Sequence, residues 1–173
     1  RDAGVDNPKD VAGKVFGVWK IGDELNANDW LKHVGVPAGQ VTFIEQRPDG
    51  LDLIERRAAC VTAMMYNEYW SILNGGLTPN DLLTVRLGGV GLGFLEDGLY
   101  ARSSALKDGR QRDILTRFLR ATLAGWSYAS ENFEEALTIS MASAPPTDAI
   151  HQRRMLESVV QLIGDTGRIG LLD

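Results

Sequence analysis

Residues 14–35 read KVFGVWKIGDELNANDWLKHVG and pass from a strand pattern to a helix pattern. The segment 14–19 is rich in β-branched and aromatic residues, which favour an extended strand. Gly22 ends that strand, and Gly35 closes a helix that begins at Gly22 or Asp23. The apolar residues of this helix recur at helical spacing and form its expected buried face: Leu25, Trp30, Leu31 and Val34. A strand that runs directly into an amphipathic helix predicts an α/β fold.

The residues on either side continue this alternation up to about residue 101. Upstream, Asn7 as cap and Pro8 at the first helical position predict a short helical turn. Downstream, the apolar runs predict strands at 41–44, 59–65 and 83–87, extended segments at 92–101, and helices at 49–54, capped by Asp49, and at 66–73. Strands that alternate with short helices predict a parallel or mixed sheet flanked by helices.

The pattern is helical only in the remainder of the chain. Helical spacing of apolar residues covers 113–130, and further helices are expected at 133–142 and 148–163. We therefore expect an α/β lobe at residues 1–101, followed by a helical segment at residues 102–173.

Composition excludes several classes of protein. With 44% hydrophobic residues the chain can bury a core, and its net charge of −5 argues against a broad nucleic-acid surface. The one cysteine, Cys60, lies in an apolar run, so we expect neither an internal disulfide nor a zinc site. No stretch approaches the roughly 18 apolar residues of a membrane span.

Three segments at predicted strand ends carry polar and aromatic side chains suited to a small flat ligand. In open α/β sheets, ligands bind at the carboxyl ends of strands, next to helix N-termini. The candidate ligand-binding residues are Trp19, Gly22, Glu24, Tyr66, Asn67, Glu68 and Glu96. Each segment also has a purely structural interpretation: core packing for Trp19, helix capping for Asn67, and an exposed turn around Glu96.

Signatures of enzymes are missing. The glycine-rich run 88–93 lacks the Lys-Ser/Thr ending of a P-loop and a clear following helix. His33 and His151 have no nearby nucleophile or metal-ligand pattern, and no Gly-x-Ser-x-Gly motif occurs. We expect no catalytic residues, no metal and no cofactor.

Two motifs are specific when they are taken together and in order: AMMYNEY at 63–69 and GFLEDGLYA at 93–101. Weaker motifs accompany them: NPKDVAGK at 7–14, GVW at 17–19, RFLRA at 117–121, ENFEEA at 131–136 and HQRRM at 151–155. This set resembles the ABC-importer substrate-binding proteins for thiamine-pyrimidine precursors, a family that includes the fungal thiamine pyrimidine synthase.

The resemblance implies a two-lobed fold of the type II periplasmic-binding-protein class that closes on its ligand like a hinge. It aligns residues 1–101 with the second lobe and 102–173 with the return toward the first lobe, so we expect a partial chain that lacks the amino-terminal lobe. Such a chain carries half of a cleft, and we expect it to bind ligand weakly and to self-associate through exposed apolar surface.

The resemblance also implies function. Residues 66–68 and Glu96 would read a pyrimidine such as formylaminopyrimidine or hydroxymethylpyrimidine, with Trp19, Gly22 and Glu24 near the cleft, and the partner would be an ABC permease. The full-length protein would be periplasmic or anchored outside the cytoplasm by a lipid.

Two departures from the family pattern keep alternatives open. Ile21 stands where relatives often have a second glycine, so the ligand differs in one alternative: another heterocycle or a sulfonate-like anion. The fungal synthase has a cysteine-rich run where this chain has 93–97 without cysteine, which argues against a synthase-type enzyme. The resemblance places the histidine and lysine of that chemistry in the missing portion, so the synthase alternative stays open.

Overall fold

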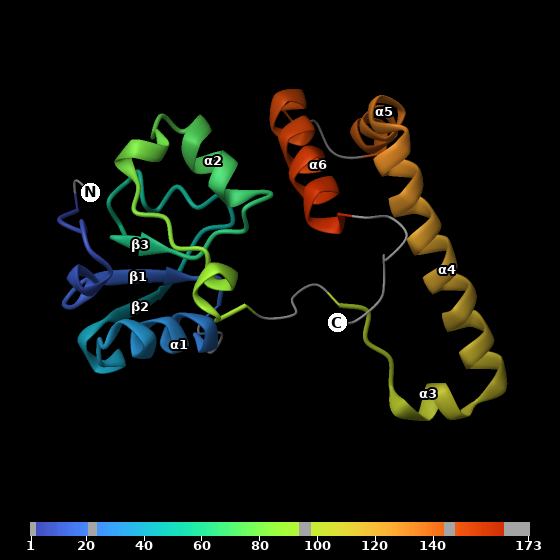
Figure 1. Ribbon diagram of the computed structural model, residues 1–173, viewed down its shortest axis with the longest axis horizontal. Coiled ribbons are helices and arrows are strands. Elements are labelled where there is room, and N and C mark those ends of the chain that lie inside the picture. Colours follow the sequence, from blue (N-terminus) through green and yellow to red (C-terminus); the bar gives the residue numbers. More distant parts are fainter. Residues whose placement is uncertain (1–2, 21–23, 94–97, 144–147, 165–173) are drawn as a thin grey trace. The chain divides into compact units, whose positions relative to one another are not determined.

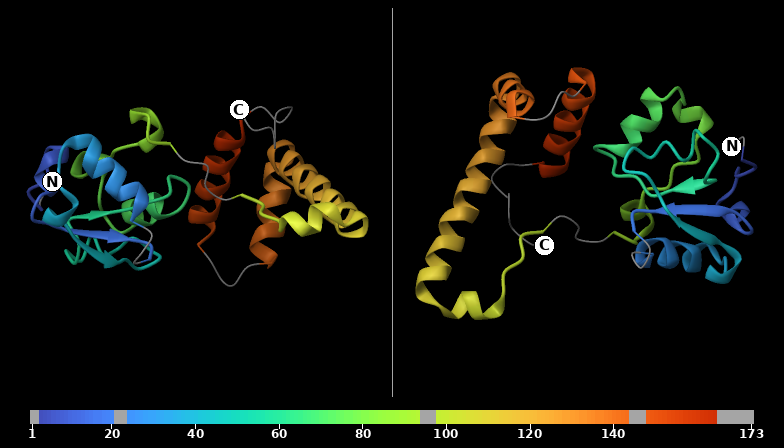
Figure 2. Two further views of the ribbon diagram at one scale, coloured as in Figure 1. Left: turned by 90° about the horizontal axis from the view of Figure 1, so that it is seen from below. Right: turned by 180° about the vertical axis from the view of Figure 1, so that it is seen from behind.

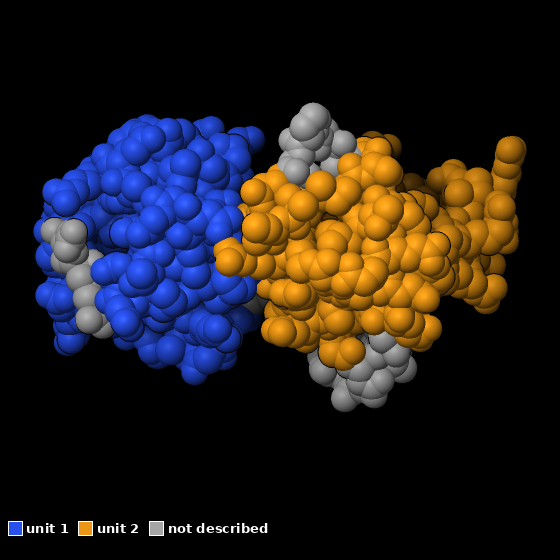
Figure 3. Space-filling view, turned by 90° about the horizontal axis from the view of Figure 1, so that it is seen from above, with its two compact units in different colours: residues 1–94 blue, residues 95–173 orange. Residues whose placement is uncertain are grey.

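The computed structural model describes residues 3–20, 24–93, 98–143 and 148–164. They form two compact units, residues 1–94 and 95–173, which Figure 3 distinguishes by colour.

The first unit is built on a three-stranded parallel sheet (Figure 1). Its strands are β1 (Val15–Val18), β2 (Thr42–Glu45) and β3 (Cys60–Val61), in the order β2-β1-β3. Phe16 fixes the register, because it lies opposite Phe43 of β2 and Cys60 of β3. The predicted α/β class with a flanked sheet is confirmed, and the sheet is parallel throughout the described residues.

Helix α1 (Leu25–Val34) lies along one face of the sheet, and α2 (Glu68–Asn74) lies on the other side, as the right-hand view of Figure 2 shows. Trp30 packs edge-on against Phe16 with ring centroids 6.0 Å apart, and Leu31 is fully buried. Gly35 ends α1 as predicted, at a φ of 77° that favours glycine. The prediction for Leu25 is wrong: it opens the helix and its side chain is 73% exposed.

The described part of this unit also contains short 3-10 helices: η1 (Pro8–Val11), η2 (Ala38–Gln40), η3 (Pro79–Asp81) and η4 (Leu87–Val90). The helical turn with Asn7 as cap is confirmed, because its side chain accepts a hydrogen bond from the Lys9 amide.

Three of the predicted elements differ from the structure. Residues 49–54 make turns rather than a helix, because Asp49 and Asp52 bond to nearby backbone amides, a local competitor of helix formation. Of the strand predicted at 59–65, only Cys60–Val61 pairs with β1. Residues 83–87 have strand-forming composition, but no strand of the described chain pairs with them, and they lead irregularly into η4.

The second unit is helical, as predicted. It contains α3 (Ser103–Lys107), α4 (Gly109–Glu131), α5 (Phe133–Ser143) and α6 (Ala149–Ile163). Asp108 caps α4 by accepting a bond from the Gln111 amide, and Asp148 caps α6 in the same way through the His151 amide. These caps set the two helix starts, of which the first lies four residues before the predicted one.

Helices α5 and α6 are joined by a two-pronged ion pair. Arg153 donates from Nη1 and Nη2 to the two carboxylate oxygens of Glu134, at 2.7 Å each. This bonding lowers the pKa of Glu134 and raises that of Arg153. Both side chains are well exposed, so water screens the pair and it adds little to stability.

This unit buries little apolar surface by itself. Leu137 is its one buried apolar side chain among the described residues. Large apolar side chains are exposed along the helices, including Ile114, Phe118, Trp126, Ile139 and Leu162. Over the described ranges, no helix is both long and apolar enough to span a membrane.

Candidate functional site

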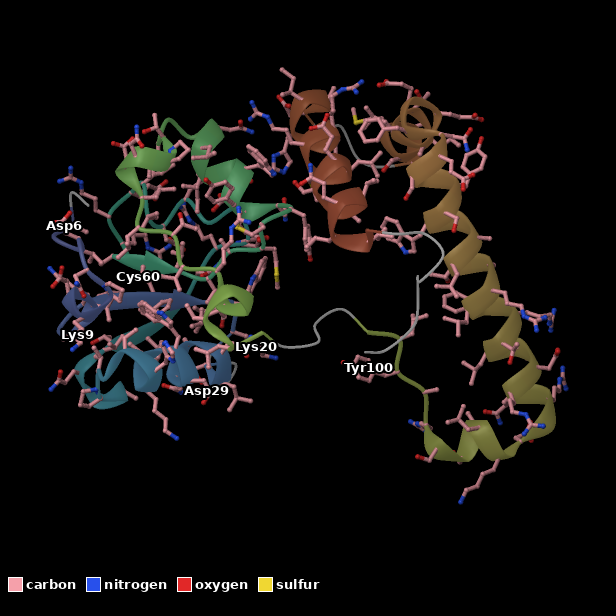
Figure 4. All side chains as sticks on the ribbon, viewed as in Figure 1. Asp6, Lys9, Lys20, Asp29, Cys60 and Tyr100 are labelled. Carbon is pink, nitrogen blue, oxygen red and sulfur yellow. The ribbon has the colours of Figure 1, made fainter. Side chains whose placement is uncertain are left out.

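The carboxyl ends of the three strands meet at one edge of the sheet, because all three run in parallel. Trp19 and Lys20 follow β1, Gln46 follows β2, and Thr62 follows β3. Figure 4 shows Lys20 at the end of β1, and Cys60 farther to the left of the view, on β3. We call this the carboxyl edge. It is the part of the first unit where an open α/β sheet presents ligand-binding side chains.

The segment from Thr62 to Glu68, which we call the edge loop, connects β3 to α2. Glu68 is 1% exposed, and its carboxylate bonds within the loop. Its Oε2 accepts from the Met64 amide at 2.8 Å, and its Oε1 accepts from Nδ2 of Asn67 at 2.8 Å. Asn67 occupies the cap position of α2 but makes no capping bond with its side chain. Glu68 therefore fixes the shape of the loop.

A second side chain fixes the start of the edge loop. Gln46 is 4% exposed, and its side chain bonds to Thr62. Its Nε2 donates to the Thr62 carbonyl at 2.8 Å, while its Oε1 accepts from the Thr62 amide at 3.0 Å and from its hydroxyl at 3.1 Å. Gln46 thus ties the end of β2 to the end of β3.

Gly17, in the middle of β1, makes room for this contact. A Cβ atom on Gly17 would lie 3.0 Å from Cβ of Gln46 and 3.2 Å from Cγ1 of Val61, closer than such atoms normally approach. Gln46 was not among the predicted site residues. The available signal was a glycine inside a strand, which often marks close approach of another group.

The structure places five of the seven predicted site residues. Trp19 and Tyr66 are half-buried at the carboxyl edge, and Asn67 and Glu68 bond to each other in the edge loop. Glu24 is half-buried directly before α1 and makes no side-chain capping bond. Gly22 and Glu96 lie outside the described residues. The ligand-binding roles of all seven stay predictions.

Cys60 does not provide a nucleophile at neutral pH. Its side chain packs against the core, and burial raises the pKa of the thiol to about 11. The thiol is therefore protonated near pH 7, and reactive cysteines have the opposite shift. Among the described residues, no three side chains of His, Cys, Asp or Glu converge to hold a metal ion.

A surface hollow of about 480 Å³ lies elsewhere on the first unit. Its lining includes Asn28, Lys32 and Pro37, at the carboxyl end of α1. Because α1 returns the chain from the end of β1 to the start of β2, this hollow lies toward the opposite edge of the sheet. It contains none of the predicted site residues.

A family model supplies the comparison that settles the class of the chain. The model described as NMT1/THI5 like matches residues 1–136, which include the whole first unit, α3 and α4. The chain belongs to the NMT1/THI5-like family. Among curated proteins, none matches the chain.

NMT1/THI5-like proteins include ABC solute-binding proteins for pyrimidine precursors, and their fold is like that of type II periplasmic-binding proteins. The resemblance drawn from the AMMYNEY and GFLEDGLYA motifs is therefore confirmed at the level of the family and of the fold. Small-molecule binding is the activity that membership of the NMT1/THI5-like family suggests.

Proposed function

We propose that this chain captures a thiamine-pyrimidine precursor, of the formylaminopyrimidine or hydroxymethylpyrimidine type, for an ABC permease. The observation that carries the proposal is the shared position of Trp19 and the edge loop at the carboxyl edge, in a chain of the NMT1/THI5-like family. The protein acts by binding and release, without a catalytic residue or a cofactor.

The chemistry of the edge suits a flat, polar ring. The half-buried rings of Trp19 and Tyr66 offer apolar faces on which a heterocycle can stack. Asn67 supports recognition of the ring edge, since its bond to Glu68 fixes the plane of its amide. In this proposal Glu68 acts mainly by shaping the loop, and Glu96 is the carboxylate that pairs with the exocyclic amine of the ligand.

A sulfonate-like anion fits this edge less well. Lys20 is exposed there, but Glu24 precedes α1 and Glu68 lies in the loop, so negative charge already occupies the helix starts. Anions bind helix N-termini that carry unpaired amides and positive potential. A pyrimidine with an amine is the better match to these carboxylates.

A synthase-type enzyme is the other alternative. We propose against it because residues 93–97 contain none of the cysteines that the resemblance associates with the fungal synthase.

The proposal assigns the first unit to the second lobe of a two-lobed receptor that acts outside the cytoplasm. The opposite wall of the cleft then comes from another lobe. We accordingly propose that this 173-residue chain binds its ligand weakly and self-associates through the exposed apolar side chains of α4 and α6.

Tyr66 provides the test of this function. We expect Tyr66→Ala to weaken binding of formylaminopyrimidine about tenfold, because loss of ring stacking removes roughly 1.5 kcal/mol. Calorimetric titration measures this, with Tyr66→Phe as the matched control that keeps the ring and stays close to the parent affinity.

Two results would contradict the proposal. Equal affinity of the Ala variant and the parent would remove Tyr66 from the binding surface. Tighter binding of an alkyl sulfonate than of the pyrimidine would favour the anion alternative.

A further inference from the structure

The side-chain amide of Gln46 is buried at the carboxyl edge, and its nitrogen and oxygen both form hydrogen bonds with Thr62. It has 4% of its surface exposed, and its three hydrogen bonds all reach Thr62, sixteen residues away. A buried amide destabilises a fold unless its donor and its acceptor are both matched. Here the donor meets a carbonyl and the acceptor meets an amide, so the contact selects glutamine over side chains that only accept or only donate.

This contact adds to the backbone ladder. The backbone amide of Gln46 donates to the Val18 carbonyl at 2.8 Å, and the backbone amide of Thr62 donates to the Gly17 carbonyl at 3.1 Å. Both strand ends are therefore already paired to β1 through the backbone. The side chain of Gln46 goes further, because it joins the two outer strands directly at the residue where the edge loop begins.

The edge loop is consequently held at both ends by buried side chains. Gln46 holds Thr62, and Glu68 holds the Met64 amide and the Asn67 side chain. Tyr66 lies between the two ties. Any ligand that stacks on Tyr66 meets a ring whose position depends on both of them.

We infer that Gln46 is a positioning residue for the ligand-binding edge: through Thr62 it sets where Tyr66 and Asn67 stand. This inference rests on the proposed function for its effect on ligand, and on the hydrogen bonds alone for its effect on the loop. Because Gln46 is buried, its proposed role is to act through Thr62.

Gln46→Glu is the sharpest test, because it replaces only the NH₂ donor of the side chain by an oxygen and keeps the length of the side chain. An ionised carboxylate would set an acceptor against the Thr62 carbonyl, whereas a protonated carboxyl would restore one donor and one acceptor. Burial and the facing carbonyl raise the pKa of this carboxyl above its unfolded-state value, so the ionised form prevails at high pH and the neutral form returns as pH falls. The variant should therefore be loosened at high pH and rescued at low pH.

Amide hydrogen exchange provides the measurement. In Gln46→Glu we expect the protection factors of the Met64 and Asn67 amides to fall about tenfold at about pH 8 and to recover at about pH 5, relative to the parent at each pH. Gln46→Met should lose protection at both pH values. The control is Glu45→Gln, which swaps the same two groups in the reverse direction at the neighbouring exposed position. We expect this variant to keep the protection factors of the parent.

The Val36 amide, which donates to the Leu31 carbonyl at 2.9 Å, reports on the rest of the unit and should keep its protection. If it also loses protection, the variant has unfolded globally, and Thr62→Val then decides. That change deletes only the hydroxyl bond to Gln46, and we expect it to lower Met64 protection about threefold, the loss of one modest bond. An unchanged loop in Thr62→Val, or a Gln46→Glu variant with no pH-dependent recovery, would overturn the inference.

Titration with formylaminopyrimidine separates this inference from the proposed function. We expect Gln46→Glu to bind more weakly at about pH 8 and to regain affinity at about pH 5 in parallel with loop protection. Unchanged affinity in a loosened loop would overturn the positioning role and leave the proposed function standing. Absence of binding in the parent would contradict the proposed function and leave the exchange result to decide the effect on the loop.

Discussion

Asp52→Ala should lower the free energy of unfolding by about 2–4 kcal/mol. The change removes a buried carboxylate and leaves its hydrogen-bond donors without an acceptor. Asp52 is 0% exposed. Its Oδ2 accepts from the Arg47 amide at 2.7 Å, and its Oδ1 accepts from Nη1 of Arg57 at 2.6 Å. Arg47 also approaches Oδ1 with its Nε, at 3.2 Å.

The position of Asp52 in the chain explains why so much depends on it. Its backbone carbonyl accepts from the amides of Arg57 and Ala58, directly before β3. One residue thus shapes the whole connection between β2 and β3. The loss stays below that of a fully buried ion pair, since the Arg57 side chain is half-exposed and can be solvated once the carboxylate is gone, whereas Nε and Nη2 of Arg47 are buried.

Urea denaturation followed by tryptophan fluorescence measures this effect. Asp49→Asn is the matched control, because Asp49 accepts from the Leu51 amide at a partly exposed position and asparagine can still accept there. We expect that control to change the free energy of unfolding by less than about 0.5 kcal/mol. Equal midpoints for Asp52→Ala and the parent would show that the buried carboxylate does not hold this connection.

Leu31→Ala should cost about 2–5 kcal/mol, because it leaves a cavity in the core of the first unit. Leu31 is 0% exposed and belongs to the cluster formed by α1 and the sheet, with Phe16, Val18 and Trp30. Leu25 supplies a control in the same helix: its side chain is largely exposed, and Leu25→Ala should cost less than about 0.5 kcal/mol.

Thermal unfolding of the two leucine variants in parallel gives the comparison. The same substitution at two positions of one helix keeps the change in helix propensity similar, so the difference reports burial. A cost for Leu25→Ala equal to that for Leu31→Ala would mean that α1 packs with a different face toward the sheet.

Elements controlled by neighbouring residues were predictable from sequence. The cap at Asn7, the end of α1 at Gly35 and the start of α6 near Asp148 all depend on groups within a few residues. The long helices of the second unit were predictable for the same reason, since helical periodicity is a local pattern. The family of the chain was also predictable from sequence, because several motifs occur together and in the same order, which is more specific than any one of them.

Contacts between distant residues were not predictable in this way. Gln46 reaches Thr62 across sixteen positions, and nothing in the local pattern of either residue names the other. Asp52 turned a segment with helical spacing into turns by bonding to the Arg47 amide. Leu25 fits the apolar periodicity of α1, but it is the first residue of the helix, and its side chain lies outside the core. A strand needs a partner, and 83–87 has none in the described chain.

The position of the ligand is the central claim, and a two-dimensional NMR titration of this chain with formylaminopyrimidine tests it most directly. Weak binding suffices for this measurement, because chemical shifts report position even at low affinity. We predict shifts concentrated on the indole of Trp19 and on the backbone amides of Tyr66 and Asn67. The account would be contradicted by an unperturbed carboxyl edge at a ligand concentration of about 10 mM, far above the range of ordinary receptor affinities. It would be contradicted equally by shifts gathered at the hollow around Asn28 and Lys32.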